Sequence, residues 1–125
     1  MGAVIYLLDS VILIDHFNGI EAATAFLREH REEAAISAIT RAEVLTGFDE
    51  EQRALPARLL DVFACLPLDR AIADLAAHLR RLHRWKLPDA IQAAVAEHHG
   101  LRLVTRNAKD FPADRFDFVL TPYSL

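Results

Sequence analysis

The chain has 125 residues, of which 53% are hydrophobic and 26% charged, and this composition excludes a disordered chain. The length predicts one domain, spanning residues 1–125, with a single buried core, and no apolar run is long enough to span a membrane. The net charge of −4 argues against a protein that binds nucleic acid through its overall charge.

Short apolar strands alternate with helical segments along the chain. Residues 4–8 form a continuous apolar run with no basic segment before it, which predicts a strand buried on both faces rather than a signal peptide. Further strands are expected at 34–37, 65–68, 101–105 and 116–120. Helices are expected at 11–17, 21–30, 40–48, 52–63, 69–85 and 88–99. This alternation predicts an α/β fold with a central, mostly parallel sheet flanked by helices.

The single cysteine, Cys65, has no partner for an internal disulfide. It therefore fits a reducing compartment such as the cytoplasm. Cys65 lies within the apolar run 62–66, so we expect its side chain to be buried.

Oxygen-bearing side chains stand at strand ends or helix starts in four separate segments. They are Asp9, Glu43, Asp89, Asn107 and Asp110. The working site of a parallel α/β sheet lies at the carboxyl ends of its strands. We therefore expect these side chains to meet on one rim of the sheet.

Each of these residues also has a purely structural interpretation. Asp9 fits an N-cap, Thr40 and Glu43 fit a capping box, and Asp89 fits the first turn of a helix begun by Pro88. Asn107 likewise fits a cap. Capping does not explain why all of them should share one rim, and it is compatible with metal binding because a helix N-terminus keeps a carboxylate ionised.

An acidic set of this kind favours a hard cation. Mg²⁺ and Mn²⁺ bind carboxylate and water oxygens, and such a site can activate a water for attack on a phosphodiester. The sequence has no nucleophile elbow, P-loop or glycine fingerprint, and no Cys/His pattern that supports zinc.

A basic stretch at residues 78–86 precedes Asp89. Its side chains Arg80, Arg81 and Arg84 fit either the solvated face of an amphipathic helix or a contact with RNA phosphates. Trp85 could stack on a base, although burial against the core is the favoured interpretation.

Four blocks of the sequence, in this order, resemble the motifs of PIN domains, and above all those of the VapC toxins of toxin–antitoxin pairs. The blocks are residues 8–15 (LDSVILID), 37–47 (SAITRAEVLTG), 87–94 (LPDAIQAA) and 103–111 (LVTRNAKDF). Each block is weak alone, but the ordered set spans residues 4–111 and is specific.

The resemblance implies a PIN-like three-layer fold and an endoribonuclease that depends on Mg²⁺ or Mn²⁺. It also implies a homodimer inhibited by a small VapB-like antitoxin. Asp9, Glu43 and Asp89 match the acidic positions of the family and inherit its metal-binding and catalytic roles. Many PIN domains have an Asp where this chain has the neutral Asn107. In this chain the resemblance then implies that Asp110, one helical turn further on, supplies the negative charge through a water.

Three other residues belong to the motif blocks. Ser10 and Thr105 are assigned as water or phosphate contacts, and Asp15 as a structural residue or a supporting one behind the site.

Three alternatives remain from the sequence. One is a PIN nuclease of RNA processing or DNA repair without a toxin role, against which the short length argues. Another is a non-catalytic PIN-like module that binds protein or DNA, against which the three intact acids argue. A phosphatase of the haloacid dehalogenase type needs a second Asp two residues after the first, where this chain has Val11.

Overall fold

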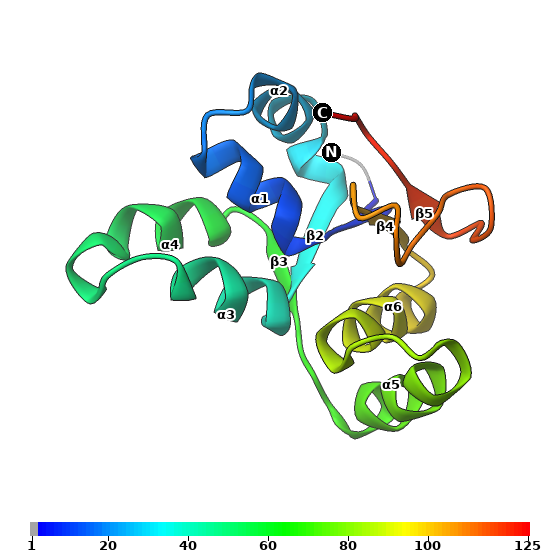
Figure 1. Ribbon diagram of the computed structural model, residues 1–125. Coiled ribbons are helices and arrows are strands. Elements are labelled where there is room, and N and C mark those ends of the chain that lie inside the picture. The colour runs from blue at the N-terminus through cyan, green and yellow to red at the C-terminus, as the bar shows by residue number, and fades with distance from the viewer. Residues whose placement is uncertain (1–2) are drawn as a thin grey trace.

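The computed structural model describes residues 3–125, which fold around a five-stranded sheet. The strands are β1 (Tyr6–Leu8), β2 (Ala34–Ser37), β3 (Ala64–Leu66), β4 (Arg102–Val104) and β5 (Val119–Leu120). Their order across the sheet is β3-β2-β1-β4-β5, and each neighbouring pair is parallel (Figure 1). The prediction of an α/β fold with a mostly parallel sheet is confirmed.

Helices connect the strands. They are α1 (Ser10–Phe17), α2 (Glu21–His30), α3 (Ala38–Thr46), α4 (Ala54–Leu60), α5 (Arg70–His83) and α6 (Leu87–His99), with 3₁₀ turns at Arg31–Glu33 and Glu50–Gln52. Within residues 3–125, none of the helices is long and apolar enough to cross a lipid bilayer. Gly100 ends α6 with φ 66°, a left-handed conformation that glycine adopts without strain, as the sequence predicted.

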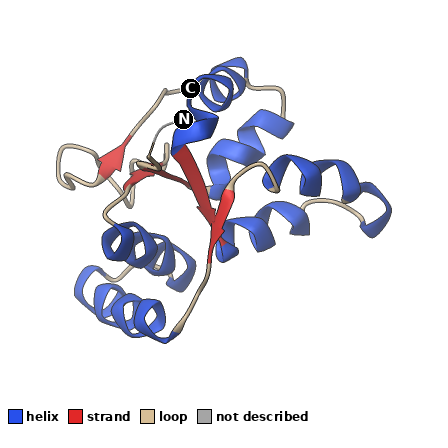
Figure 2. Ribbon diagram, turned by 180° about the vertical axis from the view of Figure 1, so that it is seen from behind, coloured by secondary structure: helices blue, strands red, loops and turns tan. Residues whose placement is uncertain are grey.

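Each face of the sheet is buried under its own group of helices. Leu7 and Leu103 point into a core formed with α5 and α6, whereas Leu8 and Val104 point into a second core formed with α1 to α4. Neighbouring residues of a strand face opposite sides, so apolar runs in β1 and β4 serve both cores. Figures 1 and 2 show the resulting three layers, with α5 and α6 packed together and the other helices across the sheet from them.

The strand order reverses direction between β1 and β4. From β1 the chain builds outward to β2 and β3, and then returns to the other side of β1 for β4 and β5. Ligands of open α/β sheets bind at the carboxyl ends of the strands that flank such a reversal. Asp9 directly follows β1 and Thr105 directly follows β4, so these two residues mark that point.

Two predictions about burial are wrong. Cys65 is exposed, because β3 forms the edge of the sheet and its first residues are not covered by a helix. Val4 and Ile5 are 39% and 41% exposed and precede β1, so only the end of the apolar run 4–8 is buried. Residues 1 and 2 lie outside the described part of the chain.

Candidate active site

An open cavity of about 590 Å³ lies at the carboxyl ends of β1 and β4. Its walls come from the start of α1, from α3, from the first turn of α6 and from the loop after β4. The lining residues are Asp9, Ser10, Val11, Glu43, Asp89, Arg106, Asn107, Ala108 and Lys109. The fold thus brings together three acids that are far apart in the sequence, at the rim where the sequence analysis expected them.

Asp9 is buried, with 7% of its surface exposed, and is held by three donors. Its Oδ1 accepts hydrogen bonds from the Ser10 backbone N–H (2.9 Å) and from Gln92 Nε2 (3.3 Å). Its Oδ2 accepts one from the Thr105 hydroxyl (2.7 Å). Burial nevertheless raises the pKa of Asp9, because these three hydrogen bonds only partly offset the lost hydration. Asp9 is also the N-cap of α1, so both of its interpretations apply.

Thr105 is fully buried and supports Asp9 from behind. Its hydroxyl donates to Asp9 and accepts the backbone N–H of Asn107 at 3.0 Å. The structure therefore places Thr105 under the cavity wall and Ser10 in the wall itself.

Gln92 is a residue of the site that was not predicted from the sequence. It is 1% exposed and lies in the middle of α6. Its amide donates to Asp9 and to the Thr40 hydroxyl, and its carbonyl oxygen accepts from the Ser37 hydroxyl at 2.8 Å. The signal in the sequence was a lone polar residue among the apolar residues 90–96, because a buried amide needs partners of its own.

Glu43 does not form the capping box that was considered from the sequence. The N-cap of α3 is Ser37, whose hydroxyl accepts the Thr40 backbone N–H at 3.1 Å. Glu43 therefore lies beyond the first turn, and its carboxylate is available to the cavity. Partial burial, with a smaller contribution from the charge of Asp9, raises the pKa of Glu43, and the Ser10 side chain opposes this by a hydrogen bond.

Asp89 is the third acid of the cavity, and its pKa is raised as well. It lies in the first turn of α6, as predicted, where Pro88 occupies one of the first two helical positions. Burial and the charges of Asp9, Asp110 and Glu43 raise the pKa of Asp89 to about 6, against a small opposing effect of Lys86. Burial is the largest cause, and the charge repulsion from the three neighbouring acids adds to it.

Asn107 and Asp110 form one hydrogen-bonded unit. The Asn107 amide donates to Asp110 Oδ2 at 3.1 Å, and Asn107 Oδ1 accepts the Asp110 backbone N–H at 3.3 Å. Asn107 lines the cavity, whereas Asp110 is not among its lining residues. Asp110 still affects the site through its charge, since it contributes to the raised pKa of Asp89.

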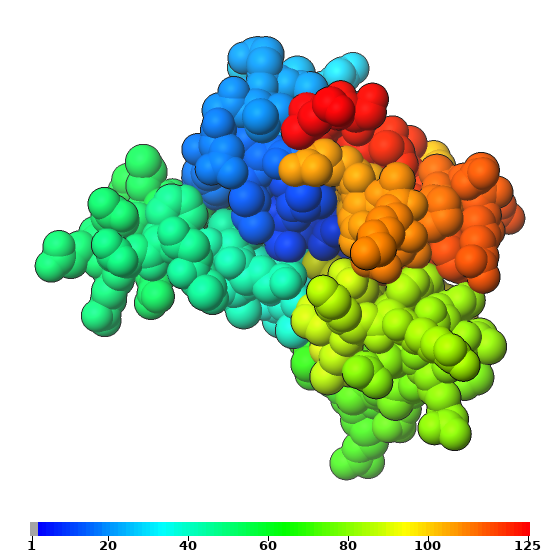
Figure 3. Space-filling model, in the orientation of Figure 1, coloured from blue at the N-terminus to red at the C-terminus, as the bar shows by residue number. Residues whose placement is uncertain are grey.

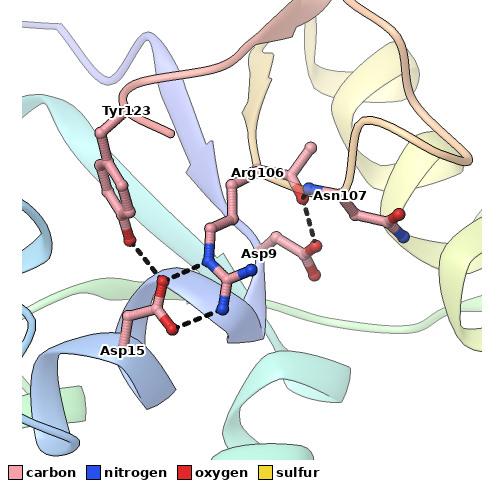
Figure 4. A network of polar contacts seen from close by, with 6 residues as sticks. Asp9, Asp15, Arg106, Asn107 and Tyr123 are labelled. Carbon is pink, nitrogen blue, oxygen red and sulfur yellow. Dashed lines mark hydrogen bonds and ion pairs between the residues drawn. The ribbon is translucent and has the colours of Figure 1, made fainter. Parts of the chain in front are cut away.

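Arg106 brings a positive charge to the cavity wall (Figure 4). Its guanidinium donates to Asp15 through Nε (2.6 Å) and through NH2 (2.8 Å), and the Tyr123 hydroxyl donates to the same carboxylate at 2.8 Å. Asp15 is 3% exposed, which agrees with the structural role expected for it. The role of Arg106 was not predicted from the sequence, although this residue directly follows Thr105. Tyr123 gave no signal because the last residues match no motif.

The arginines of the basic stretch before Asp89 differ in their position relative to the site. Arg80, Arg81 and Arg84 are all exposed, but only Arg84 lines a cavity beside the site, whereas Arg80 and Arg81 lie outside both cavities. Trp85 is 6% exposed and packs on Phe111 and Phe116, so its predicted burial is confirmed.

The chemistry of the cavity fits a hard, hydrated cation. Within residues 3–125, no group of three or more His, Cys, Asp or Glu side chains converges closely enough to form a preformed metal cage. The carboxylates of Asp9, Glu43 and Asp89 instead flank an open space, and the charge of Asp9 contributes to the raised pKa of both Glu43 and Asp89. Mg²⁺ and Mn²⁺ suit such an arrangement, because Mg²⁺ keeps several waters and commonly binds protein through one or two carboxylates.

The fold is that of a PIN domain. The family model described as "PIN domain" matches residues 6–117, so the chain belongs to the PIN-domain family.

The chain is similar to a protein named as a ribonuclease and to solved structures, one of which is described as a toxin–antitoxin complex. The chain is 34% identical to Ribonuclease VapC10 of Mycobacterium tuberculosis over 95% of this chain and 93% of that protein. A toxin–antitoxin complex from Klebsiella pneumoniae contains a chain of 38% identity, with a TM-score of 0.86 over 96% of this chain and 99% of that one. FitAcB from Neisseria gonorrhoeae has 25% identity and a TM-score of 0.79, covering 97% of this chain and 100% of that one.

Proposed function

We propose that this protein is an endoribonuclease that depends on Mg²⁺ or Mn²⁺ and acts as the toxin of a toxin–antitoxin pair. The observation that carries the proposal is the meeting of Asp9, Glu43 and Asp89 around one cavity at the carboxyl ends of the strands. The relative named Ribonuclease VapC10 supports RNA as the substrate, and the Klebsiella pneumoniae complex supports the role as a toxin.

In this proposal Asp9, Glu43 and Asp89 hold the metal ion, with Asn107 as a neutral fourth contact and Asp110 acting through Asn107. The bound cation would lower the pKa of a water and neutralise the charge that develops on the leaving oxygen of the phosphodiester. The raised pKa values of Glu43 and Asp89 support this assignment, because a cation would relieve the charge repulsion that contributes to them.

The other residues of the site orient these groups. Thr105 and Gln92 fix both oxygens of Asp9, so that Asp9 is preorganised before a metal ion arrives. Arg106 uses Nε and NH2 to bind Asp15. Its remaining nitrogen, NH1, points toward Asp9 in Figure 4, where it could donate to a phosphate oxygen.

The test is cleavage of a single-stranded RNA by the purified protein with Mg²⁺ or Mn²⁺, with EDTA, and with the metal restored. We expect cleavage that stops in EDTA and returns with the metal. Asp89→Asn should abolish it, whereas Asp74→Asn, which removes an exposed acid from α5, should leave it unchanged. Cleavage at full rate in EDTA by metal-free protein would exclude this mechanism.

The proposal also includes the partners and the compartment. A small VapB-like antitoxin would inhibit the toxin, and the active form would be a homodimer in the cytoplasm, where a toxin meets its RNA. The exposed thiol of Cys65 supports a reducing compartment. Exposed apolar side chains such as Leu55, Val62 and Leu68 support an interface with another chain.

Two measurements test the partners. Light scattering at micromolar concentration should give the mass of a dimer, and a monomer alone would count against the homodimer. The gene upstream should encode a short DNA-binding protein that co-purifies with this chain and suppresses RNA cleavage. A neighbour that neither binds nor inhibits would count against the toxin role.

A further inference from the structure

A second cavity, of about 150 Å³, lies beside the acidic one, between the end of α5 and the loop after β4. Three cationic side chains line it, namely Arg84, Lys109 and Arg115, together with one acid, Asp110, and the rings of Trp85 and Phe116. Lys109 lines both cavities, so the two are adjacent. Figure 3 shows the orange loop after β4 meeting the yellow-green turn between α5 and α6 on this face of the molecule.

The three cations are available to an anion. Among the ion pairs found within residues 3–125, none involves Arg84, Lys109 or Arg115. The Arg115 guanidinium lies over the ring of Phe116, 5.3 Å from its centroid, which holds it against the cavity wall. Asp110, the acid in the lining, already accepts a hydrogen bond from Asn107. On a chain with a net charge of −4, this cavity is therefore a local concentration of positive charge.

The backbone of Arg84 supports a function for its side chain. Arg84 ends α5 in the left-handed conformation, with φ 60° and ψ 30°, and is the one non-glycine residue with positive φ in the described chain. Gly100 has nearly the same angles at the end of α6, where glycine adopts them freely. An arginine at this position is strained, and such strain is typical of functional sites.

The wall of the cavity is anchored to the acidic site. The Trp85 indole N–H donates to the backbone oxygen of Asp110 at 3.0 Å, which ties the end of α5 to the loop that carries Asn107, Lys109 and Asp110. A ligand held by Arg84 and Arg115 is thereby fixed in position relative to Asp89 and Asn107.

We propose that this second cavity binds a backbone phosphate of the RNA, the one next to the phosphate that lies in the acidic cavity. The proposal rests on the proposed function. Guanidinium and ammonium groups that converge from several segments recognise phosphate oxygens through charge-assisted hydrogen bonds. Such contacts position a nucleic acid without reading its sequence. The two cavities together would allow an acidic chain to hold a polyanion: a metal ion held by Asp9, Glu43 and Asp89 would neutralise one phosphate, and the cations of the second cavity would neutralise its neighbour.

Binding of a short, fluorescently labelled single-stranded RNA tests the proposal, in an Asp89→Asn background that does not cleave. Arg84→Gly and Arg115→Gln should each weaken binding about tenfold and reduce the slope of log affinity against log salt by about 0.7. Arg70→Gln is the matched control, because it removes the same charge about 20 Å away at the other end of α5. Its binding should not change. Arg84→Gly should melt no lower than the parent, since glycine relieves the strained backbone.

A chemical cycle identifies the phosphate. Each RNA of a set carries one uncharged methylphosphonate at a different position. At one position this substitution should weaken binding to the parent protein but should not weaken binding to Arg84→Gly any further. If Arg84→Gly and Arg115→Gln bind RNA like Arg70→Gln, the phosphate site is wrong while the proposed function stands. The same conclusion follows if every methylphosphonate lowers the affinity equally in all of the proteins. A lower melting temperature of Arg84→Gly would assign Arg84 to packing and also overturn it. If the wild type neither binds nor cleaves RNA, the proposed function fails together with the phosphate site.

Discussion

Arg106 and Asp15 form a two-point ion pair across the molecule: Nε and NH2 of the arginine lie 2.6 and 2.8 Å from the two carboxylate oxygens. Asp15 comes from α1 and Arg106 from the loop after β4, and Tyr123 near the C-terminus donates to the same carboxylate. The pair keeps the pKa of Asp15 below its usual range, chiefly through the hydrogen bonds from Arg106. It therefore joins three distant segments and holds a guanidinium at the edge of the acidic cavity.

Substituting Tyr123 or Asp15 in this network should destabilise the fold. We expect Tyr123→Phe to lower the free energy of unfolding by about 1 kcal/mol, since it removes one hydrogen bond to a charged group. Asp15→Asn should lower it by about 2 kcal/mol, because it leaves a guanidinium without its counter-charge. Urea unfolding measures both, and Tyr6→Phe, whose hydroxyl makes no hydrogen bond in the described structure, is the control. Equal stabilities for all three variants would contradict the network's role.

Asp89→Asn should raise the stability of the metal-free protein at neutral pH. The pKa of Asp89 is about 6 in the fold and 3.8 ordinarily, so the fold favours the protonated form. Its ionisation therefore destabilises the fold progressively as the pH rises from about 4 to about 6. The variant has no such charge. In EDTA it should melt above the wild type at pH 7.5, and this difference should shrink or reverse at pH 4.

Metal binding should remove the difference in melting temperature between the wild type and Asp89→Asn. Adding Mg²⁺ or Mn²⁺ at pH 7.5 should raise the melting temperature of the wild type more than that of Asp89→Asn, because the ion compensates the repulsion of Asp89 by its neighbouring acids, which the variant lacks. Differential scanning fluorimetry gives both values. An equal metal-induced shift in the two proteins would remove Asp89 from the metal site.

The sequence predicted the acidic rim well because its signal is local. A carboxylate at the end of a buried strand, or in the first turn of a helix opened by a proline, can be recognised without knowing the fold. The contacts of Gln92 and Arg106 could not be predicted in this way, because each depends on partners that the fold supplies. Gln92 bonds to Ser37, 55 residues away, and Arg106 to Asp15, 91 residues away. Cys65 shows the same limit, since an apolar run does not reveal whether its strand is central or at the edge.

Gln92→Leu should damage both stability and activity. The leucine fits the volume of the buried site but removes the Gln92 acceptor of the Ser37 hydroxyl and one donor each from Thr40 and Asp9. Each unsatisfied buried group costs about 1–3 kcal/mol, so we expect a loss of several kcal/mol in the free energy of unfolding. Cleavage per folded molecule should fall as well, since Asp9 loses one of its three donors.

Gln52→Leu is the control for the loss of a glutamine, because Gln52 is exposed in a 3₁₀ turn far from the sheet rim. Urea unfolding and RNA cleavage on the same samples separate the two effects. Wild-type stability in Gln92→Leu would mean that the buried hydrogen-bond network is dispensable.

Glu43→Gln gives the sharpest separation between capping and chemistry. The capping role at the start of α3 belongs to Ser37, so Ser37→Ala should cost about 1 kcal/mol from the cap and more from the lost bond to Gln92. Glu43→Gln should not lower the free energy of unfolding, because it removes a carboxylate whose pKa is raised by burial and by Asp9. It should nevertheless abolish metal-dependent cleavage, since a neutral amide is a weaker ligand for a hard cation. Glu97→Gln, an exposed glutamate of α6, should change neither property. If Glu43→Gln cleaves RNA at the wild-type rate per folded molecule, Glu43 is not part of the metal site and the acidic centre reduces to Asp9 and Asp89.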